Sequence, residues 1–65
     1  MKLREFIRDN PNQQIVLLWF NKDGDLQTKY IHQKQIFFIS ERLLNMEVME
    51  TDKDNEEGWI EVWLK

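Results

Sequence analysis

The chain has 65 residues, a formal net charge of −3 and no cysteine. A chain of this length buries only about 60% of the surface that its unfolded form exposes, so we expect one domain, residues 1–65, with a thin core. Without cysteine there can be no disulfide, and a single histidine, His32, excludes a Cys/His zinc site. Apolar packing must therefore stabilise the fold, within one subunit or between subunits, and we expect no metal and no cofactor.

Acidic residues are concentrated in one part of the chain. Residues 47–57 hold six Asp and Glu and one Lys, whereas residues 1–46 hold seven Lys and Arg against five acids. Proteins that bind nucleic acid usually carry a basic stripe instead, so the composition argues against such a partner. The first ten residues alternate charged and apolar groups, and no segment approaches the ~20 apolar residues of a membrane span. We therefore expect a cytoplasmic protein without a membrane partner.

The first predicted element is an amphipathic helix of about two turns in residues 2–9. Leu3, Phe6 and Ile7 follow the i, i+3, i+4 spacing of one helix face, and charged residues occupy the other positions. The helix should end at Asn10-Pro11, because the residue before a proline is pushed out of the helical region. A helix this short is marginal alone and must dock on another element.

A hairpin is predicted next. The apolar run QIVLLWF, residues 14–20, is followed by the turn Asn21-Lys22-Asp23-Gly24 and by a second strand from Leu26 to about His32. Asparagine at the first turn position and glycine at the fourth suit a type I turn whose glycine adopts the left-handed bulge conformation. If Asn21 faces Asp25, the expected cross-strand pairs are Phe20 with Leu26, Trp19 with Gln27, Leu18 with Thr28, Leu17 with Lys29, Val16 with Tyr30 and Ile15 with Ile31.

This register divides the hairpin into two faces, because successive strand residues point to opposite sides. One face holds Val16, Leu18 and Phe20 with their partners Tyr30, Thr28 and Leu26, and we interpret it as the core face beneath the helix. The other face holds Ile15, Leu17, Trp19 and Ile31 together with Gln27 and Lys29. Another part of the protein, or a partner, must also bury this second set of large apolar side chains.

The middle of the chain gives weaker signals. The segment IFFI, residues 36–39, is apolar without a clear period, and Ser40 is expected to cap a brief helical turn in residues 41–45. From Met46 the alternation predicts another strand, which leads into an acidic loop over residues 52–58.

The last segment, GWIEVWLK, is the clearest strand of the chain. Its residues Ile60, Val62 and Leu64 point to one side, and Trp59, Glu61 and Trp63 point to the other. Taken in order, the elements predict an α+β fold: a short N-terminal helix packed on a small antiparallel sheet of two hairpins, with a short helical turn between the hairpins.

We find no motif for catalysis. The turn near Asn21 fails as a calcium loop, because Trp19 and Tyr30 occupy the positions that need Asp and Glu. Ser40, the only serine, lies in no G-x-S-x-G motif, and two glycines cannot form a phosphate cradle. The carboxylates lie in a hydrophilic run, where burial cannot separate their pKa values for acid–base work. We therefore expect no enzyme, no catalytic residue and no small-molecule substrate.

The tryptophans are the remaining signal, because each lies opposite the best core face of its strand. Tryptophan is enriched at interface hot spots, and exposed apolar patches mark partner sites. Our first hypothesis is a non-catalytic protein-interaction module that self-associates, with a homodimer as the first guess. The candidate interface consists of Ile15, Leu17, Trp19, Ile31, Trp59 and Trp63.

Two other accounts of this face remain open. In the first, residues 33–45 form a second layer, with IFFI folded over the face. In the second, single-stranded nucleic acid stacks on its aromatic rings, although the register places only Lys29 and Lys65 near them.

The order of features also carries a resemblance. The segment MKLREFIRDNP, the strand QIVLLWF with its hairpin, the segment ISERLLNMEV (residues 39–48) and the closing strand GWIEVWLK succeed one another along nearly the whole chain. This order resembles small uncharacterised accessory proteins of phages and prophages of Gram-positive bacteria. The resemblance implies an accessory protein in the cytoplasm of a bacterial host cell, in a class of which some members bind and block host enzymes or defence complexes. It implies no catalytic residue.

The acidic segment gives a second hypothesis within that class. A row of carboxylates could imitate the phosphates of a nucleic acid and occupy the channel of a host nucleic-acid or defence enzyme. The alternative, which we favour, is that the acids keep an apolar protein soluble. The candidate acidic surface consists of Glu47, Glu50, Asp52, Asp54, Glu56 and Glu57.

Overall fold

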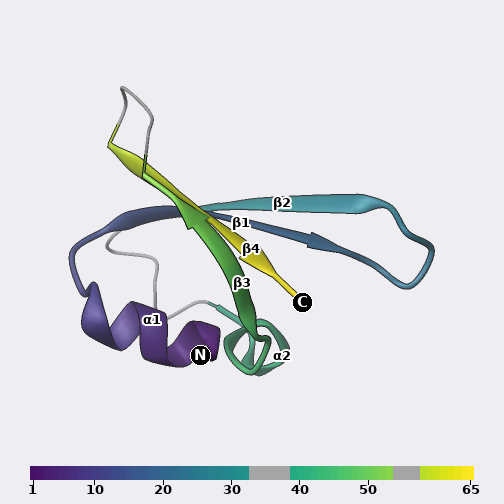
Figure 1. Ribbon diagram of the computed structural model, residues 1–65, viewed down its shortest axis with the longest axis horizontal. Helices are drawn as coiled ribbons and strands as arrows, with labels where there is room; N and C mark the ends of the chain where they lie inside the picture. The colour runs from purple at the N-terminus through teal and green to yellow at the C-terminus, as the bar shows by residue number, and fades with distance from the viewer. Residues whose placement is uncertain (33–38, 54–57) are drawn as a thin grey trace.

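The computed structural model describes residues 1–32, 39–53 and 58–65. Its elements follow the expected order and confirm the α+β class, with a short helix at the N-terminus and another between the two hairpins. Figure 1 shows α1 (Leu3–Asp9), β1 (Gln14–Phe20), β2 (Leu26–Ile31), α2 (Glu41–Leu44), β3 (Val48–Asp52) and β4 (Trp59–Leu64).

The four strands form one sheet in the order β2-β1-β4-β3. Strands β1 and β2 are antiparallel, as are β3 and β4, so each expected hairpin is present. The hairpins join through β1 and β4, which run parallel, and the sheet is therefore mixed rather than wholly antiparallel. Residue patterns within each hairpin do not encode this pairing, because it depends on how the two hairpins dock.

The first hairpin has the register that its turn predicts. All six expected pairs are present, from Ile15 with Ile31 to Phe20 with Leu26. The N–H of Asn21 donates to the carbonyl oxygen of Asp25 at 2.9 Å, and the N–H of Gly24 donates to the carbonyl oxygen of Asn21 at 3.1 Å. Gly24 has a φ of +83°, the left-handed conformation that glycine adopts most easily. The turn therefore fixes the register through local bonds.

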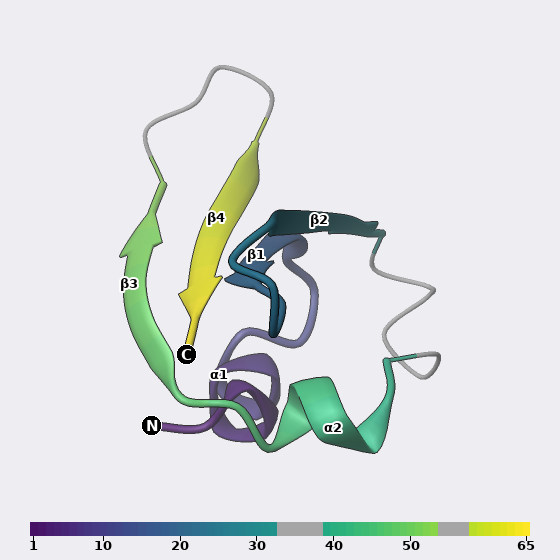
Figure 2. The ribbon, with the colours of Figure 1, turned by 90° about the vertical axis from the view of Figure 1, so that its right-hand side faces the viewer.

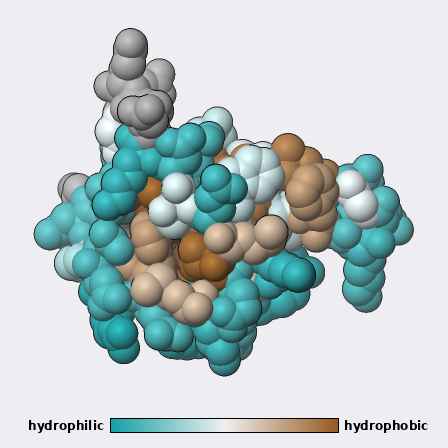
Figure 3. All heavy atoms as spheres, in the orientation of Figure 1, coloured by the Kyte–Doolittle hydropathy of each residue, from teal (hydrophilic) through white to brown (hydrophobic). Residues whose placement is uncertain are grey.

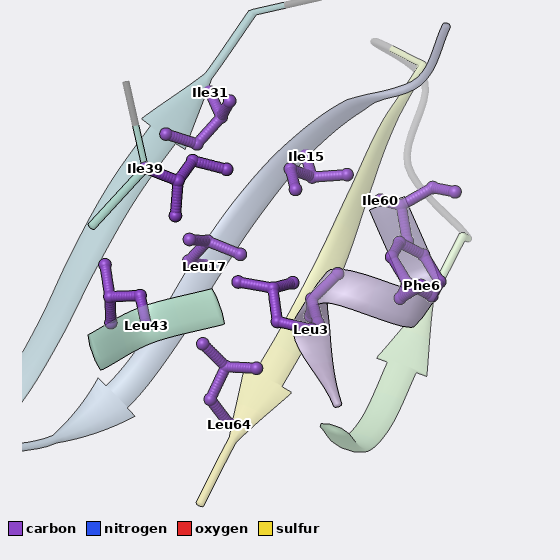
Figure 4. Close-up of a cluster of buried hydrophobic side chains, with 10 residues drawn as sticks. Leu3, Phe6, Ile15, Leu17, Ile31, Ile39, Leu43, Ile60 and Leu64 are labelled. Atoms are coloured by element: carbon purple, nitrogen blue, oxygen red, sulfur yellow. The ribbon is translucent and has the colours of Figure 1, made fainter. Parts of the chain in front are cut away.

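Both helices lie on the same side of the sheet (Figure 2). The core lies between them and the sheet, and Figure 4 shows its side chains converging from every element except β3. Val48 of β3 packs against this cluster as a partly buried residue. The buried core cluster consists of Leu3, Phe6, Ile15, Leu17, Ile31, Ile39, Leu43, Ile60, Val62 and Leu64.

The expected assignment of the two faces of β1 is wrong. Ile15 and Leu17 point into the core, whereas Phe20 lies on the opposite face and is 59% exposed. The parallel pairing gives the reason, because it aligns Ile15 with Ile60 and Leu17 with Val62. Those pairs join the aliphatic sides of both strands into one continuous surface. The helices cover this aliphatic surface and leave the more aromatic one open.

Hydrogen bonds at the start of each helix, and one ion pair between the helices, hold α1 and α2 in place. The backbone N–H of Lys2 donates to Oε1 of Glu5 at 3.2 Å at the start of α1. The helix ends at Asp9, as the Asn10-Pro11 sequence predicts. Ser40 caps α2 as expected, with its hydroxyl accepting from the N–H of Leu43 at 3.4 Å. Arg4 of α1 and Glu41 of α2 form an ion pair that links the two helices.

The N-terminal residues also pair with the start of β3. The N–H of Leu3 donates to the carbonyl oxygen of Met46 at 2.9 Å, and the N–H of Val48 donates to that of Met1 at 2.7 Å. These bonds fix α1 beneath the β3 side of the sheet.

Among the residues that the structure describes, no helix is long and apolar enough to cross a membrane.

Candidate functional site

The six residues of the predicted interface do not share one surface. Ile15, Leu17 and Ile31 are 1%, 0% and 2% exposed, and they belong to the core. Trp19 is half-buried and packs against the same cluster, and its buried indole N–H has no hydrogen-bond partner among the described residues. Trp59 and Trp63 lie on the opposite side of the sheet, because they alternate with the buried residues of β4. The interface as predicted is therefore corrected: only its two β4 tryptophans are available to a partner.

The residues that cover the β1 face come partly from the segment named in the competing account. Ile39 and Leu43 pack on Ile15, Leu17 and Ile31, so part of residues 33–45 does form a second layer. Residues 36–38 of the IFFI segment lie outside the described residues.

The side of the sheet opposite the helices, here called the outer face, has no described helix or strand over it. The strand registers give its members, because residues paired across neighbouring strands lie on the same face. The outer face consists of Gln14, Val16, Leu18, Phe20, Leu26, Thr28, Tyr30, Glu50, Asp52, Trp59, Glu61 and Trp63.

Aromatic rings contact one another across the outer face. The rings of Phe20 and Trp63 are stacked, with their centroids 6.5 Å apart and an interplanar angle of 29°. Tyr30 meets Trp59 edge to face at a centroid distance of 5.5 Å. His32, just after β2, also meets Trp59 edge to face at 5.0 Å, and its Nδ1 lies 3.2 Å from Oε1 of Gln14. These contacts link the two hairpins across the middle of the sheet.

The rings partly cover the aliphatic residues of β1 on this face. Val16 and Leu18 are only 7% and 9% exposed, although no described element lies above them. Around them, Phe20, Leu26 and Tyr30 are 59%, 48% and 62% exposed. Figure 3 shows apolar residues among the hydrophilic surface of the β1–β2 hairpin. The outer face therefore presents large apolar side chains to solvent.

Acidic side chains border the tryptophans. Glu50 of β3 pairs with Trp63, and Asp52 of β3 pairs with Glu61 of β4. Among the described strand residues of the outer face, every charged side chain is a carboxylate. The face is thus apolar toward β2 and acidic toward β3, a combination that suits a partner with both apolar and cationic groups.

The predicted acidic surface is brought together only in part. Glu50 and Asp52 lie two residues apart on β3, within the outer face. Glu47 instead binds the N-terminal amine through Oε2 at 3.1 Å. The remaining members, Asp54, Glu56 and Glu57, lie outside the described residues.

Phe20, Leu26 and Tyr30 are the surface residues that sequence reasoning missed, because we assigned them to the core. The sequence of β4 held a signal for the correct face, because the buried side of that strand is wholly aliphatic. Ile15, Leu17 and Ile31 are aliphatic like that side, whereas Phe20 and Tyr30 are aromatic like the side that carries the tryptophans. Within the described residues, no group of three or more His, Asp or Glu is placed to hold a metal ion.

The fold and the outer face define a small α+β protein with helices on one side of a mixed sheet and an open aromatic surface on the other. No protein-family model matches the chain, and no curated protein or solved structure matches it significantly.

Proposed function

We propose that the protein is a non-catalytic protein-interaction module that works as a homo-oligomer and binds another protein through its outer face. The observation that carries this proposal is the exposure of Phe20, Leu26 and Tyr30 beside Trp59 and Trp63 on a sheet face without a described covering layer. Large apolar patches on small proteins mark interaction sites, and tryptophan and tyrosine are enriched at binding hot spots.

The chemistry of the face defines the partner. The aromatic rings offer area for apolar side chains, and the carboxylates of Glu50, Asp52 and Glu61 attract cations nearby. An arginine or lysine can contact the face of Trp63 while its charge lies near Glu50. The partner is therefore a protein segment in which apolar residues alternate with Lys or Arg. A host protein bound by a phage or prophage accessory protein in the bacterial cytoplasm is the setting that the sequence resemblance supports.

The test is a selection of displayed random peptides on the purified protein. We expect enrichment of sequences that combine apolar residues with Lys or Arg, and a change of tryptophan fluorescence when such a peptide is added. The double variant Phe20→Ser/Tyr30→Ser should weaken peptide binding at least about 10-fold. The control Arg42→Ser, at an exposed position of α2, should bind as the wild type does.

Two results of the peptide experiment, and one of a parallel titration, would contradict the proposal. One is selected peptides that bind the double variant as tightly as the wild type. The other is loss of binding on Glu50→Lys/Asp52→Lys with no loss in the double variant, which would favour the acidic inhibitor of a nucleic-acid enzyme. A single-stranded oligonucleotide is titrated in parallel at low salt. Quenching of tryptophan fluorescence by the oligonucleotide but not by the peptides would favour single-strand binding instead.

A further inference from the structure

The two edges of the sheet differ in how open they are. Strand β3 carries a register shift between Val48 and Glu50, and its start pairs with the N-terminal segment through an isolated bridge between Lys2 and Glu47. Bulges, short pairing and edge charges all block the addition of another strand. Strand β2, by contrast, runs over Leu26–Ile31 without a bulge, and Lys29 is its one charged residue.

The backbone groups on the free side of β2 follow from the hairpin bonds. In an antiparallel pair, hydrogen-bonded and non-hydrogen-bonded residue pairs alternate. Because the N–H of Asn21 donates to the carbonyl oxygen of Asp25 at 2.9 Å, the bonded pairs continue at Gln27, Lys29 and Ile31. The N–H and C=O groups of the residues between them, Leu26, Thr28 and Tyr30, therefore point away from β1. No described strand pairs with this edge.

We infer that two copies of the chain join through this edge, with their β2 strands antiparallel and Thr28 of each copy opposite the same residue of the other. This inference extends the proposed homo-oligomer to a defined dimer, and it does not depend on what the outer face binds. In this register Leu26 pairs with the partner's Tyr30, so two exposed apolar side chains meet. Three residues on each strand exchange bonds, giving about six inter-chain backbone hydrogen bonds.

The neighbouring registers of this strand pair should be less stable. With a two-fold axis perpendicular to the sheet, a residue can lie opposite only those partner residues that point to the same face. These are every second residue of the partner strand, so the alternative registers differ by two residues. Shifting the pairing toward the end of β2 would place Lys29 opposite the same lysine, and like charges directly opposite each other repel. Shifting the pairing toward the turn would leave only Leu26 and Thr28 of each β2 strand to form inter-chain backbone hydrogen bonds. The register centred on Thr28 instead places Lys29 opposite the partner's Gln27, which can accept a hydrogen bond from it.

The dimer would also enlarge the proposed binding surface. An axis perpendicular to the sheet keeps both outer faces on the same side. The apolar end of one outer face, at Leu26 and Tyr30, then continues into that of the second copy, with the acidic ends at the two far edges.

Light scattering during size-exclusion chromatography gives the first test. We expect a dimer for the wild type at about 100 µM and a monomer for Thr28→Pro, whose dimer dissociation constant should rise at least about 100-fold. Because the Thr28 N–H points to the open edge, proline there removes no bond to β1, and circular dichroism should show an unchanged fold. Phe20→Ser, on β1 and not on the open β2 edge, should remain dimeric.

Oxidative cross-linking gives the second test, and it reports the register. The chain has no cysteine, so Thr28→Cys introduces a single thiol on the proposed axis. Paired residues of this kind lie about 5.5 Å apart between Cα atoms, within the range of a disulfide. We expect rapid disulfide dimers from Thr28→Cys and none from Glu50→Cys, at the opposite edge.

A monomeric wild type at high micromolar concentration would overturn the dimer, while the peptide titration of the outer face would still decide the proposed binding. A dimer that survives Thr28→Pro and leaves Thr28→Cys uncross-linked would show that copies join elsewhere. Loss of the dimer in Phe20→Ser but not in Thr28→Pro would place the contact on the outer face, and this too would overturn the inference.

Discussion

Truncation of Leu17 should destabilise the protein far more than truncation of Phe20. Leu17 is 0% exposed, lies on central strand β1 and touches the core from the side that both helices cover. Leu17→Ala should lower the free energy of unfolding by about 3 kcal/mol, from the lost burial and the cavity left behind. A domain of this size has a total of roughly 3–10 kcal/mol, so this is a large fraction.

Phe20→Ala should have a much smaller effect. Phe20 is 59% exposed, and its ring stacks on that of Trp63. Loss of this partial burial and of one ring pair should lower the free energy of unfolding by about 1 kcal/mol.

Urea unfolding followed by far-UV circular dichroism measures both effects. If Leu17→Ala is too unstable to fold, Ile15→Val provides a milder core change, expected to lower stability by about 1 kcal/mol. A larger loss in Phe20→Ala than in Leu17→Ala would refute the assignment of the covered face, because it would mean that the Phe20 side of β1 is the core.

Three further changes test local features by the same urea unfolding. Ser40→Ala should lower stability by about 1 kcal/mol, because it removes the acceptor for the Leu43 N–H; Ser40→Asp should keep most of the stability, and an equal loss in both would contradict the capping role. Gly24→Ala should also cost about 1 kcal/mol through its φ of +83° alone, since no atom lies within 4 Å of an added Cβ, and Gly24→Asn should cost less. Trp19→Phe should change stability by less than about 1 kcal/mol, because the loss of ring contacts is offset by removal of a buried N–H that has no partner among the described residues. A loss above about 2 kcal/mol in Trp19→Phe would show that the indole contributes more through packing than this balance allows.

The parts of the fold that were predictable from the sequence are those fixed by neighbouring residues. The Asn21–Gly24 turn sets the register of the first hairpin through bonds within a few residues, and all six pairs followed from it. Helix α1 ends where a proline requires it, and Ser40 caps α2, for the same local reason. These features need no knowledge of how distant elements dock.

The choice of core face depends on distant contacts and could not be predicted in this way. Both sides of β1 are apolar, so alternation alone gives no preference between Leu17 and Leu18. The decision is made by β4, more than 40 residues later, which aligns its aliphatic side with Ile15 and Leu17 through a parallel pair. Because no local signal specifies that pair, the aromatic surface was expected on the wrong side of β1, although its two β4 tryptophans were placed correctly opposite the core.

The aromatic composition of the outer face fits the lack of any described element over it. Two short helices cover one side of the sheet, whereas no described helix or strand covers the apolar residues of the other side. Phe20, Tyr30 and the two tryptophans shield these residues, since Val16 and Leu18 stay below 10% exposed beside them. Wide, flat rings can cover their strand neighbours while one side remains in solvent, which aliphatic side chains of the same number could not do. The same rings that complete the fold form the surface that we propose to bind a partner. A partner that covers them should raise the apparent stability of the protein, because it binds only the folded state.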